Sequence, residues 1–250
     1  MEGAAMFLVL FSILVYPVAF VTFVVCASIY LAFVFVFKSL GWELQYLGPL
    51  VRFLARVILL SCGQWLKVGG NWPSPTIGPC IFLFNHSSIL DALVAGAVLK
   101  GRFTGVAAQE YFFWPLWGTI MRWHNIIPIK RKCHDEAIES MRRAEEAIKN
   151  GWSIGGFPEG TRSKTGELQP FKKGLFYVAK ATGAPIVVIA IKGAYRAKSR
   201  VGWCVRPGVI TATIGKPWTL WSNGKQRYAA LSVEELRQLA EGLMATMLES

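Results

Sequence analysis

The sequence has 250 residues, a length that suits one domain with a sizeable apolar core. Hydrophobic residues make up 53% of the chain and charged residues only 17%, which excludes an intrinsically disordered protein and is atypical of an ordinary soluble one. The net charge of +12 gathers in one long stretch, a distribution that does not fit a multi-span transporter.

The N-terminal third contains the longest apolar run. Residues 6–37 carry no charged side chain, and a helix needs about 20 apolar residues to cross a membrane core. Pro17 would kink or break a helix inside this run. We therefore expect a transmembrane helix over about residues 18–37, with 6–16 as a kinked or interfacial lead-in. A cleaved signal peptide fits poorly because no Lys or Arg precedes the run, and a buried core helix is the other alternative.

A second apolar segment, residues 44–66, differs from the first because it carries Arg52 and Arg56. A spacing of four places both cations on one face of a helix, which is typical of a helix lying on a membrane surface. We expect residues 1–66 to form a membrane anchor with an interfacial helix over about 44–66. The cations after the predicted span place the rest of the chain on the cytoplasmic face of a single-pass or monotopic membrane protein.

Residues 67–250 alternate short apolar runs with helical patterns, which predicts an α/β fold with a mixed sheet flanked by helices. A helix is expected over 135–150, and Ser232 with Glu235 forms a capping box that predicts a last helix. Five scattered Cys show no metal-binding spacing, so we expect reduced thiols and no metal site. The predicted strands span 80–84, 104–108, 126–129, 153–157, 186–191 and 209–214.

The first polar motif begins where one predicted strand ends. His86 follows Asn85 directly, and Asp91 comes five residues later. A catalytic His needs a partner that fixes its tautomer, and Asp91 is suited to that role. On one straight helix this offset would separate the two side chains by about 140°, so we expect His86 in the turn before the helix. The same residues are also typical of a simple helix cap, and the spacing alone leaves that alternative open.

The second polar motif, residues 155–163, follows another predicted strand. Its glycines let the backbone approach an anion, Thr161 offers a hydroxyl, and Arg162 offers a forked guanidinium that suits phosphate. Glu159 is placed to orient Arg162. A plain glycine-rich surface turn is the alternative.

Further cations follow other apolar runs. Lys130 and Arg131 end a third strand, and residues 162–206 hold ten basic residues against one acidic residue. Such a surface can bind nucleic acid, but here it follows a membrane anchor. Anionic lipid is therefore the expected partner, and nucleic acid is not.

Together these segments resemble one family. Asn85-His86-xxxx-Asp91 and the run Phe-Pro-Glu-Gly-Thr-Arg at 157–162 are similar to the two signature motifs of the glycerolipid acyltransferases, in particular the 1-acylglycerol-3-phosphate O-acyltransferases. Residues 127–131 and 171–174 resemble further family segments. The similarity covers about residues 79–191. Two positions depart from the family pattern: Asn125 stands where Gly is usual, and Val188 where Pro is usual.

The resemblance implies a reaction and roles for these residues. His86 would be the general base that activates the sn-2 hydroxyl of a lysophosphatidic acid, and Asp91 would orient its ring. The product would be phosphatidic acid, in phospholipid biosynthesis. By the same resemblance, the acceptor's phosphate end would be bound by Lys130, Arg131, Glu159, Gly160, Thr161 and Arg162.

The implied co-substrate is acyl-CoA or acyl carrier protein, and no cofactor is implied. A serine nucleophile at Ser87 or Ser88 is disfavoured because neither serine lies in a GxSxG motif. The aromatic stretch 111–123 suits an acyl-chain tunnel, an interfacial belt or plain core. The alternatives are another lyso-lipid acceptor, such as a lyso-aminolipid, or a non-catalytic basic membrane-surface protein.

Overall fold

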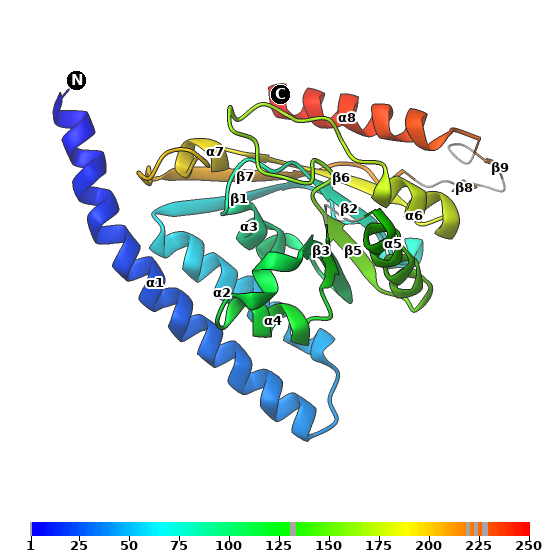
Figure 1. Cartoon of the computed structure of the whole chain (residues 1–250), viewed down its shortest axis with the longest axis horizontal. Coiled ribbons are helices and arrows are strands. Elements are labelled where there is room, and N and C mark those ends of the chain that lie inside the picture. Colours follow the sequence, from blue (N-terminus) through cyan, green and yellow to red (C-terminus); the bar gives the residue numbers. More distant parts are fainter. Residues whose placement is uncertain (1, 131–133, 219–220, 223–224, 227–229) are drawn as a thin grey trace.

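A mixed sheet of seven strands organises the chain in the computed structural model, with strand order β1-β7-β6-β2-β5-β3-β4 (Figure 1). The structure describes residues 2–130, 134–218, 221–222, 225–226 and 230–250. A separate two-stranded sheet joins β8 (Trp221–Ser222) to β9 (Lys225–Gln226). The strands of the main sheet are β1 (Gln64–Gly70), β2 (Ile81–Phe84), β3 (Phe103–Ala108), β4 (Ile127–Ile129), β5 (Ser153–Gly156), β6 (Ile186–Lys192) and β7 (Gly208–Ile214).

Strand direction determines where the loops meet. β2 pairs in parallel with β5 and β6, and β3 pairs in parallel with β5 and β4. β7 runs antiparallel to β6, and β1 is parallel to β7. The carboxyl ends of β2, β3, β4, β5 and β6 therefore lie at one edge of the sheet, the usual place for a binding site in such sheets.

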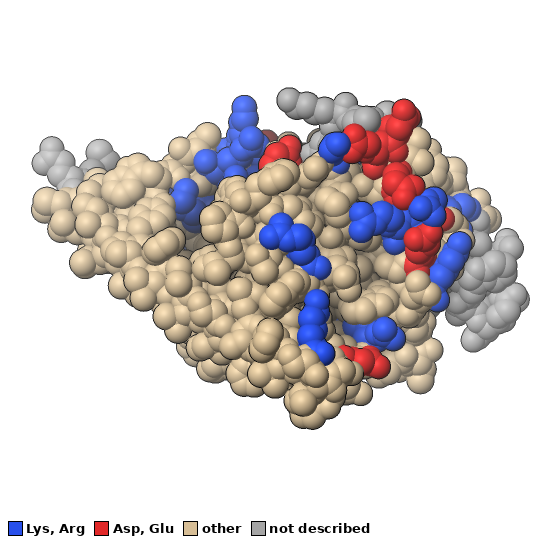
Figure 2. All heavy atoms as spheres, turned by 60° about the horizontal axis from the view of Figure 1, so that its bottom comes forward, with Lys and Arg blue, Asp and Glu red and all other residues tan. Residues whose placement is uncertain are grey.

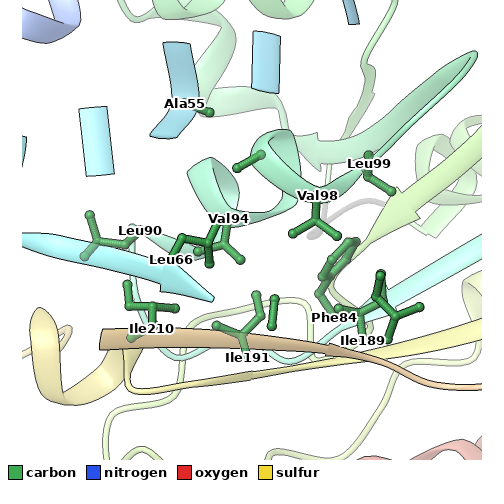
Figure 3. Packing of buried hydrophobic residues seen from close by; sticks show 14 of the residues in the cluster. Ala55, Leu66, Phe84, Leu90, Val94, Val98, Leu99, Ile189, Ile191 and Ile210 are labelled. Atoms are coloured by element: carbon green, nitrogen blue, oxygen red, sulfur yellow. The ribbon is translucent and has the colours of Figure 1, made fainter. Parts of the chain in front are cut away.

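Helices cover both faces of the sheet (Figure 1). On one face, Phe82 and Phe84 of β2 pack with residues of α2 and α3, as Figure 3 shows in part. On the other face, Ile81 and Leu83 pack with residues of α5, α6 and α8. Successive side chains of β2 point to opposite faces of the sheet, and this alternation produces the two cores. The helices are α2 (Gly48–Ser61), α3 (Asp91–Val98), α4 (Trp117–Trp123), α5 (His134–Lys149), α6 (Gly174–Thr182), α7 (Ala194–Ala197) and α8 (Val233–Glu249), with short 3-10 turns at Leu44–Leu47, Pro75–Ile77 and Gln109–Phe113.

The predicted α/β class and mixed sheet are confirmed. All six predicted strands are present with ends shifted by at most one residue, and the predicted helix over 135–150 is α5. Ser232 and Glu235 form the predicted capping box at the start of α8.

The N-terminal helix differs from the prediction in extent. α1 is one continuous helix, Glu2–Ser39, and Pro17 lies inside it. The predicted lead-in, residues 6–16, therefore belongs to the same helix as residues 18–37. Proline removes one N–H from the helical ladder, but the apolar residues on both sides continue the pattern. Two helical stretches, residues 5–39 and 44–61, are long and apolar enough to cross a membrane.

The boundary predicted after residue 66 falls inside β1, Gln64–Gly70. The helix predicted over 44–66 ends at Ser61, and Gly63 adopts φ +73°, a left-handed conformation that ends a helix. β1 then pairs with β7 along its whole length. The apolar character of Trp65 and Leu66 belongs to a strand, so the sheet begins three residues before the predicted domain.

Candidate functional site

The turn after β2 is fixed by the side chain of Asn85. Its Nδ2 donates to the carbonyl of Ile191 at 3.0 Å, and its Oδ1 accepts from the N–H of Ile191 at 2.7 Å. Asn85 is buried, so these two bonds join the ends of β2 and β6 where the strands diverge. The next residue, His86, is thereby held at the carboxyl edge of the sheet.

His86 and Asp91 form a hydrogen-bonded pair. Nδ1 of His86 lies 3.0 Å from Oδ2 of Asp91, the first residue of α3. The same Oδ2 accepts the N–H groups of Ser87 at 2.6 Å and Ser88 at 2.7 Å. Asp91 is fully buried, so these donors replace the water that its carboxylate oxygen lacks. The turn brings the pair together as predicted, and Nε2 of His86 has no partner among the described residues.

Glu159 binds the backbone of the His86 turn and forms no hydrogen bond or ion pair with Arg162 among the described residues. Its Oε1 accepts the N–H of His86 at 2.5 Å, and its Oε2 accepts the N–H of Gln169 at 3.0 Å. The carboxyl is buried, and burial raises the pKa of Glu159 to about 7 despite the two backbone N–H donors. Glu159 therefore acts on the position of His86.

The rest of the glycine-rich loop leaves a cation unpaired. Gly160 adopts φ +74°, which reverses the chain. Thr161 Oγ1 and the carbonyl of Arg162 both accept from Nη1 of Arg200, at 3.0 and 2.8 Å. The Arg162 guanidinium itself makes no hydrogen bond or ion pair within the described residues, so it is available to an external anion.

Lys130 lies at the end of a different strand from the one that carries His86. Lys130 follows β4 at the sheet edge, and its Nζ pairs with Glu136 at 2.7 Å. In the strand order, β5 and β3 stand between β4 and β2. Arg131 lies outside the described residues.

An apolar cavity of about 220 Å³ lies beside His86, between α1, α2, α3, α4 and β3. Phe157 lines it and also stacks on the His86 ring, with ring centroids 4.1 Å apart. Gly105 and Gly155 line it as neighbours in register on β3 and β5. A Cβ at Gly105 would meet the Gly155 carbonyl oxygen at 3.0 Å, so the absence of side chains keeps this wall clear.

Residues of the aromatic stretch 111–123 lie in two environments, the cavity wall and the exposed surface. Trp117 and Met121 line the cavity, whereas Phe113 is 79% exposed and Trp114 48%. The neighbouring His124 also lines the cavity, where its ring stacks on Tyr30 of α1. Burial lowers the pKa of His124 to about 4, so its imidazole is neutral at physiological pH.

Sequence reasoning missed four residues that build this site. Asn85 and Phe157 both lie in the two polar motifs. An amide side chain directly after an apolar strand indicates a residue that can bond to the backbone of a neighbouring strand. His124 and Arg200 gave no signal, because their partners come from distant segments of the chain.

The sequence model of the Acyltransferase family matches residues 66–192. A 1-acyl-sn-glycerol-3-phosphate acyltransferase of Cocos nucifera is 35% identical over 164 residues, covering 65% of this chain and 52% of the relative. The Saccharomyces cerevisiae protein of that name is 32% identical over 195 residues, covering 77% of this chain and 64% of the relative. This chain thus spans only about half to two thirds of these relatives' length.

A solved structure is similar over almost the whole chain. It is the 1-acyl-sn-glycerophosphate (LPA) acyltransferase PlsC from Thermotoga maritima, with a TM-score of 0.79 and 24% identity, covering 98% of this chain and 97% of that one. The two chains therefore share their fold, including the N-terminal helix.

Proposed function

Because this chain belongs to the Acyltransferase family, we propose that it transfers a fatty acyl group from an acyl thioester to the sn-2 hydroxyl of 1-acyl-sn-glycerol 3-phosphate. The product is phosphatidic acid. The observation that carries the proposal is the position of His86. Its ring is paired with a buried carboxylate and stacks on Phe157, which lines the apolar cavity. One ring, Phe157, thus contacts both the His86 imidazole and the apolar cavity.

The geometry supports general-base catalysis. Asp91 accepts from Nδ1–H of His86, which leaves Nε2 to take the proton of the acceptor hydroxyl. The hydroxyl oxygen attacks the thioester carbonyl carbon, a C–O bond forms and the C–S bond breaks. The imidazolium then returns its proton to the departing thiolate. The acceptor supplies the nucleophile, so no covalent enzyme intermediate is needed.

The acceptor's phosphate is assigned to the loop that carries Arg162. Its guanidinium is unpaired among the described residues and matches two phosphate oxygens at once. Gly160 and Thr161 shape this loop, and Glu159 ties it to His86. Lys130 and Arg131, from the family resemblance, remain a proposed outer part of the site.

The acyl donor is acyl-CoA or acyl carrier protein, and no cofactor takes part. Both donors are acidic and suit a chain of net charge +12. Their acyl chain occupies the apolar cavity, whose lining is almost entirely hydrocarbon and aromatic.

We propose that α1 holds the protein on a membrane while lying along the domain. Ser12 of α1 bonds the backbone of Val205 on the loop before β7, and Phe23 meets Trp117 of α4. Leu14 and Val21 on the free side are 68% and 59% exposed. A helix that contacts its domain over this length favours monotopic attachment to the cytoplasmic face.

A transfer assay tests the proposal. The full-length protein is incubated with labelled acyl-CoA and either 1-acyl-sn-glycerol 3-phosphate or 1-acyl-sn-glycerol, which differ only in the phosphate. We expect labelled phosphatidic acid from the first, at a kcat/KM at least tenfold higher than with the second. Equal use of both acceptors, or preference for a lyso-aminolipid in the same assay, would overturn the assignment of the acceptor. No transfer to any acceptor, from acyl-CoA or from acyl carrier protein in a parallel assay, would favour the non-catalytic alternative.

A further inference from the structure

The loop that follows α7 has no regular secondary structure, yet it is tied to the site at several points. We call residues 198–206 the basic loop. Ser88, two residues after His86, donates from Oγ to the carbonyl of Lys198 at 2.7 Å. At the other end, Ser12 of α1 accepts the N–H of Val205 at 2.9 Å, and Gln64 of β1 donates to the carbonyl of Arg206 at 2.7 Å. The basic loop is thus held between the N-terminal helix and the catalytic turn.

Arg200 reaches from this loop into the glycine-rich loop. Its Nη1 donates to Thr161 Oγ1 at 3.0 Å and to the Arg162 carbonyl at 2.8 Å. A guanidinium has five N–H groups. The three on Nε and Nη2 have no partner among the described residues. Arg200 is therefore fixed in place with donors to spare.

Lys198 adds a third cation. It is half-buried, and its Nζ donates to the carbonyl of Ser199 at 3.0 Å and to that of Gly202, which leaves one of its three N–H groups for an anion. Burial lowers the pKa of Lys198, and the charge of Arg162 lowers it further, so the two cations lie within electrostatic reach. Within the described part of the chain, no carboxylate is ion-paired with Arg162, Lys198 or Arg200.

We propose that Arg200, together with Lys198, binds the phosphate of the lyso-lipid acceptor and so completes the site that Arg162 begins. The inference rests on the proposed function, since it names residues for the same substrate. Three like charges without a counter-ion repel one another, and a phosphate dianion between them relieves that repulsion. Because Ser88 fixes the basic loop beside His86, a phosphate held there lies near the base that must reach the sn-2 hydroxyl.

The test compares Arg200→Ala, Arg200→Lys and Lys198→Ala with the control Arg196→Ala. Arg196 is an exposed cation four residues away on α7 that makes no hydrogen bond within the described residues. A hydrogen bond to a charged group contributes ~1.5–3 kcal/mol, which is about tenfold to a hundredfold in affinity. We expect Arg200→Ala to lower kcat/KM for 1-acyl-sn-glycerol 3-phosphate by that factor and to leave the phosphate-free acceptor and the donor's KM unchanged.

The variants also separate charge from geometry. Arg200→Lys keeps the charge but loses the fork, so it should recover only part of the loss. Lys198→Ala should lower kcat/KM for the phosphate acceptor in the same selective way, and Arg196→Ala should stay within twofold of the wild type.

A binding measurement gives a second readout. The phosphate acceptor should raise the melting temperature of the wild type, and this rise should shrink in Arg200→Ala.

Three outcomes would overturn the inference. If Arg200→Ala lowers kcat/KM equally for both acceptors, Arg200 only supports the glycine-rich loop. If the donor's KM rises instead, the bound anion belongs to the donor. If the variant behaves like the wild type, Arg200 binds no substrate. By contrast, a wild type that neither acylates the phosphate acceptor nor is stabilised by it would overturn the proposed function itself.

Discussion

At the scale of single residues, the turn between β2 and α3 makes the chemistry of His86 possible. Asp91 opens α3 and accepts the N–H groups of Ser87 and Ser88, so one carboxylate caps the turn and holds the imidazole. Both N–H partners of Asp91 precede α3, so the carboxylate holds the turn and does not cap the helix, the alternative that the spacing left open. These bonds fix the geometry of the pair, and the pair fixes the tautomer.

Replacing either member of the pair should reduce turnover strongly. We expect His86→Ala to lower kcat ~10²–10⁴-fold, the usual contribution of a general base. Asp91→Asn should also lower kcat, because the amide leaves the tautomer unset. Acyl transfer is measured alongside the melting temperature. A folded His86→Ala protein with near-normal turnover would contradict the mechanism.

Glu159 gives the fold a pH dependence. Its folded pKa of about 7 lies above the ordinary value of 4.5, so between these pH values the folded state binds more protons than the unfolded state. The contribution of Glu159 to the free energy of unfolding therefore falls as pH rises from 4.5 to 7. Chemical denaturation at several pH values measures this slope, and Glu159→Gln should flatten it.

Glu159→Gln should also lower the stability of the fold. Both oxygens of Glu159 accept backbone N–H groups, from His86 and Gln169, so an amide NH₂ would face one donor. An unsatisfied buried group costs ~1–3 kcal/mol, and we expect Glu159→Gln to destabilise the fold by that amount near pH 7. An unchanged pH slope in this variant would mean that another group titrates.

Asn125 explains one departure from the family pattern. Its φ is +54°, a left-handed conformation that Gly adopts freely and Asn tolerates best among other residues. The Gly that is usual in the family and the observed Asn125 thus both allow this left-handed backbone conformation. Asn125→Gly should change the melting temperature little, whereas Asn125→Val should destabilise the fold by ~1–3 kcal/mol. Equal melting temperatures for both variants would contradict this explanation.

At the scale of elements, the sequence predicted strands well where apolar runs were short and bounded. The apolar run of β6 and the residues Phe82 and Phe84 of β2 predict strands from the local sequence alone. β1 was missed because Trp65 and Leu66 continue the apolar character of α2, and only Gly63 marks the break. Pairing with β7, more than 130 residues away, decides the structure of this segment, and local pattern holds no information on such a partner.

The cavity is another feature that only packing reveals. Its walls come from α1, α2, α3, α4 and β3, none of which shows a hollow in its own sequence. The contributing glycines, Gly96, Gly105 and Gly155, read as ordinary until their neighbours are known. The polar residues of the site, by contrast, stand at strand ends, where a sequence signals them clearly.

Gly96 offers a way to change the volume of the cavity. A Cβ at this position of α3 would meet only Ala55 at 3.9 Å and Val51 at 4.0 Å, both on α2. Gly96→Ala should therefore fold normally and gain up to ~1 kcal/mol from helix propensity. Gly96→Leu extends further between α2 and α3, so we expect it to shift donor preference toward shorter acyl chains. Rates with a series of acyl-CoA lengths measure the shift, and an unchanged preference in Gly96→Leu would contradict an acyl chain in this cavity.

At the scale of the whole molecule, charge and apolar surface separate. Figure 2 shows an area almost without charged side chains at the left of the view, with Lys, Arg, Asp and Glu side chains spread over its centre and right. Phe53 of α2 and Phe113 before α4 are exposed apolar residues in addition to those of α1. Contiguous exposed apolar surface of this kind marks a membrane or protein contact. In a chain of net charge +12, an anionic membrane satisfies both the apolar and the basic parts.

Removing the N-terminal third is a poor test of this attachment. Ala55 and Leu59 of α2 belong to the core under the sheet, and β1 starts before residue 67. A chain beginning there would expose core residues, so its loss of membrane binding would have two causes. Substitutions on the free side of α1 avoid this difficulty.

Leu14 and Val21 are seven residues apart on α1, so they share a face, and both are more than half exposed. We expect Leu14→Asp with Val21→Asp to release the protein from vesicles in flotation. An aspartate at the centre of a membrane helix costs ~2.5–3.5 kcal/mol, and less in a helix at the interface. The matched control is Ile138→Asp on α5, which is 56% exposed on the opposite side of the sheet and suffers the same loss of helix propensity. It should float like the wild type.

Salt separates the apolar contribution from the basic one. At 1 M salt the Debye length is about 3 Å, so attraction between Lys or Arg and anionic headgroups is almost lost. Wild-type protein should stay with vesicles at 1 M salt if α1 is the main anchor, and neutral vesicles should bind it nearly as well as anionic ones. If the double variant floats as well as the wild type at low salt but both are released at high salt, the Lys and Arg side chains are the anchor. In that case α1 serves to position the basic loop through Ser12.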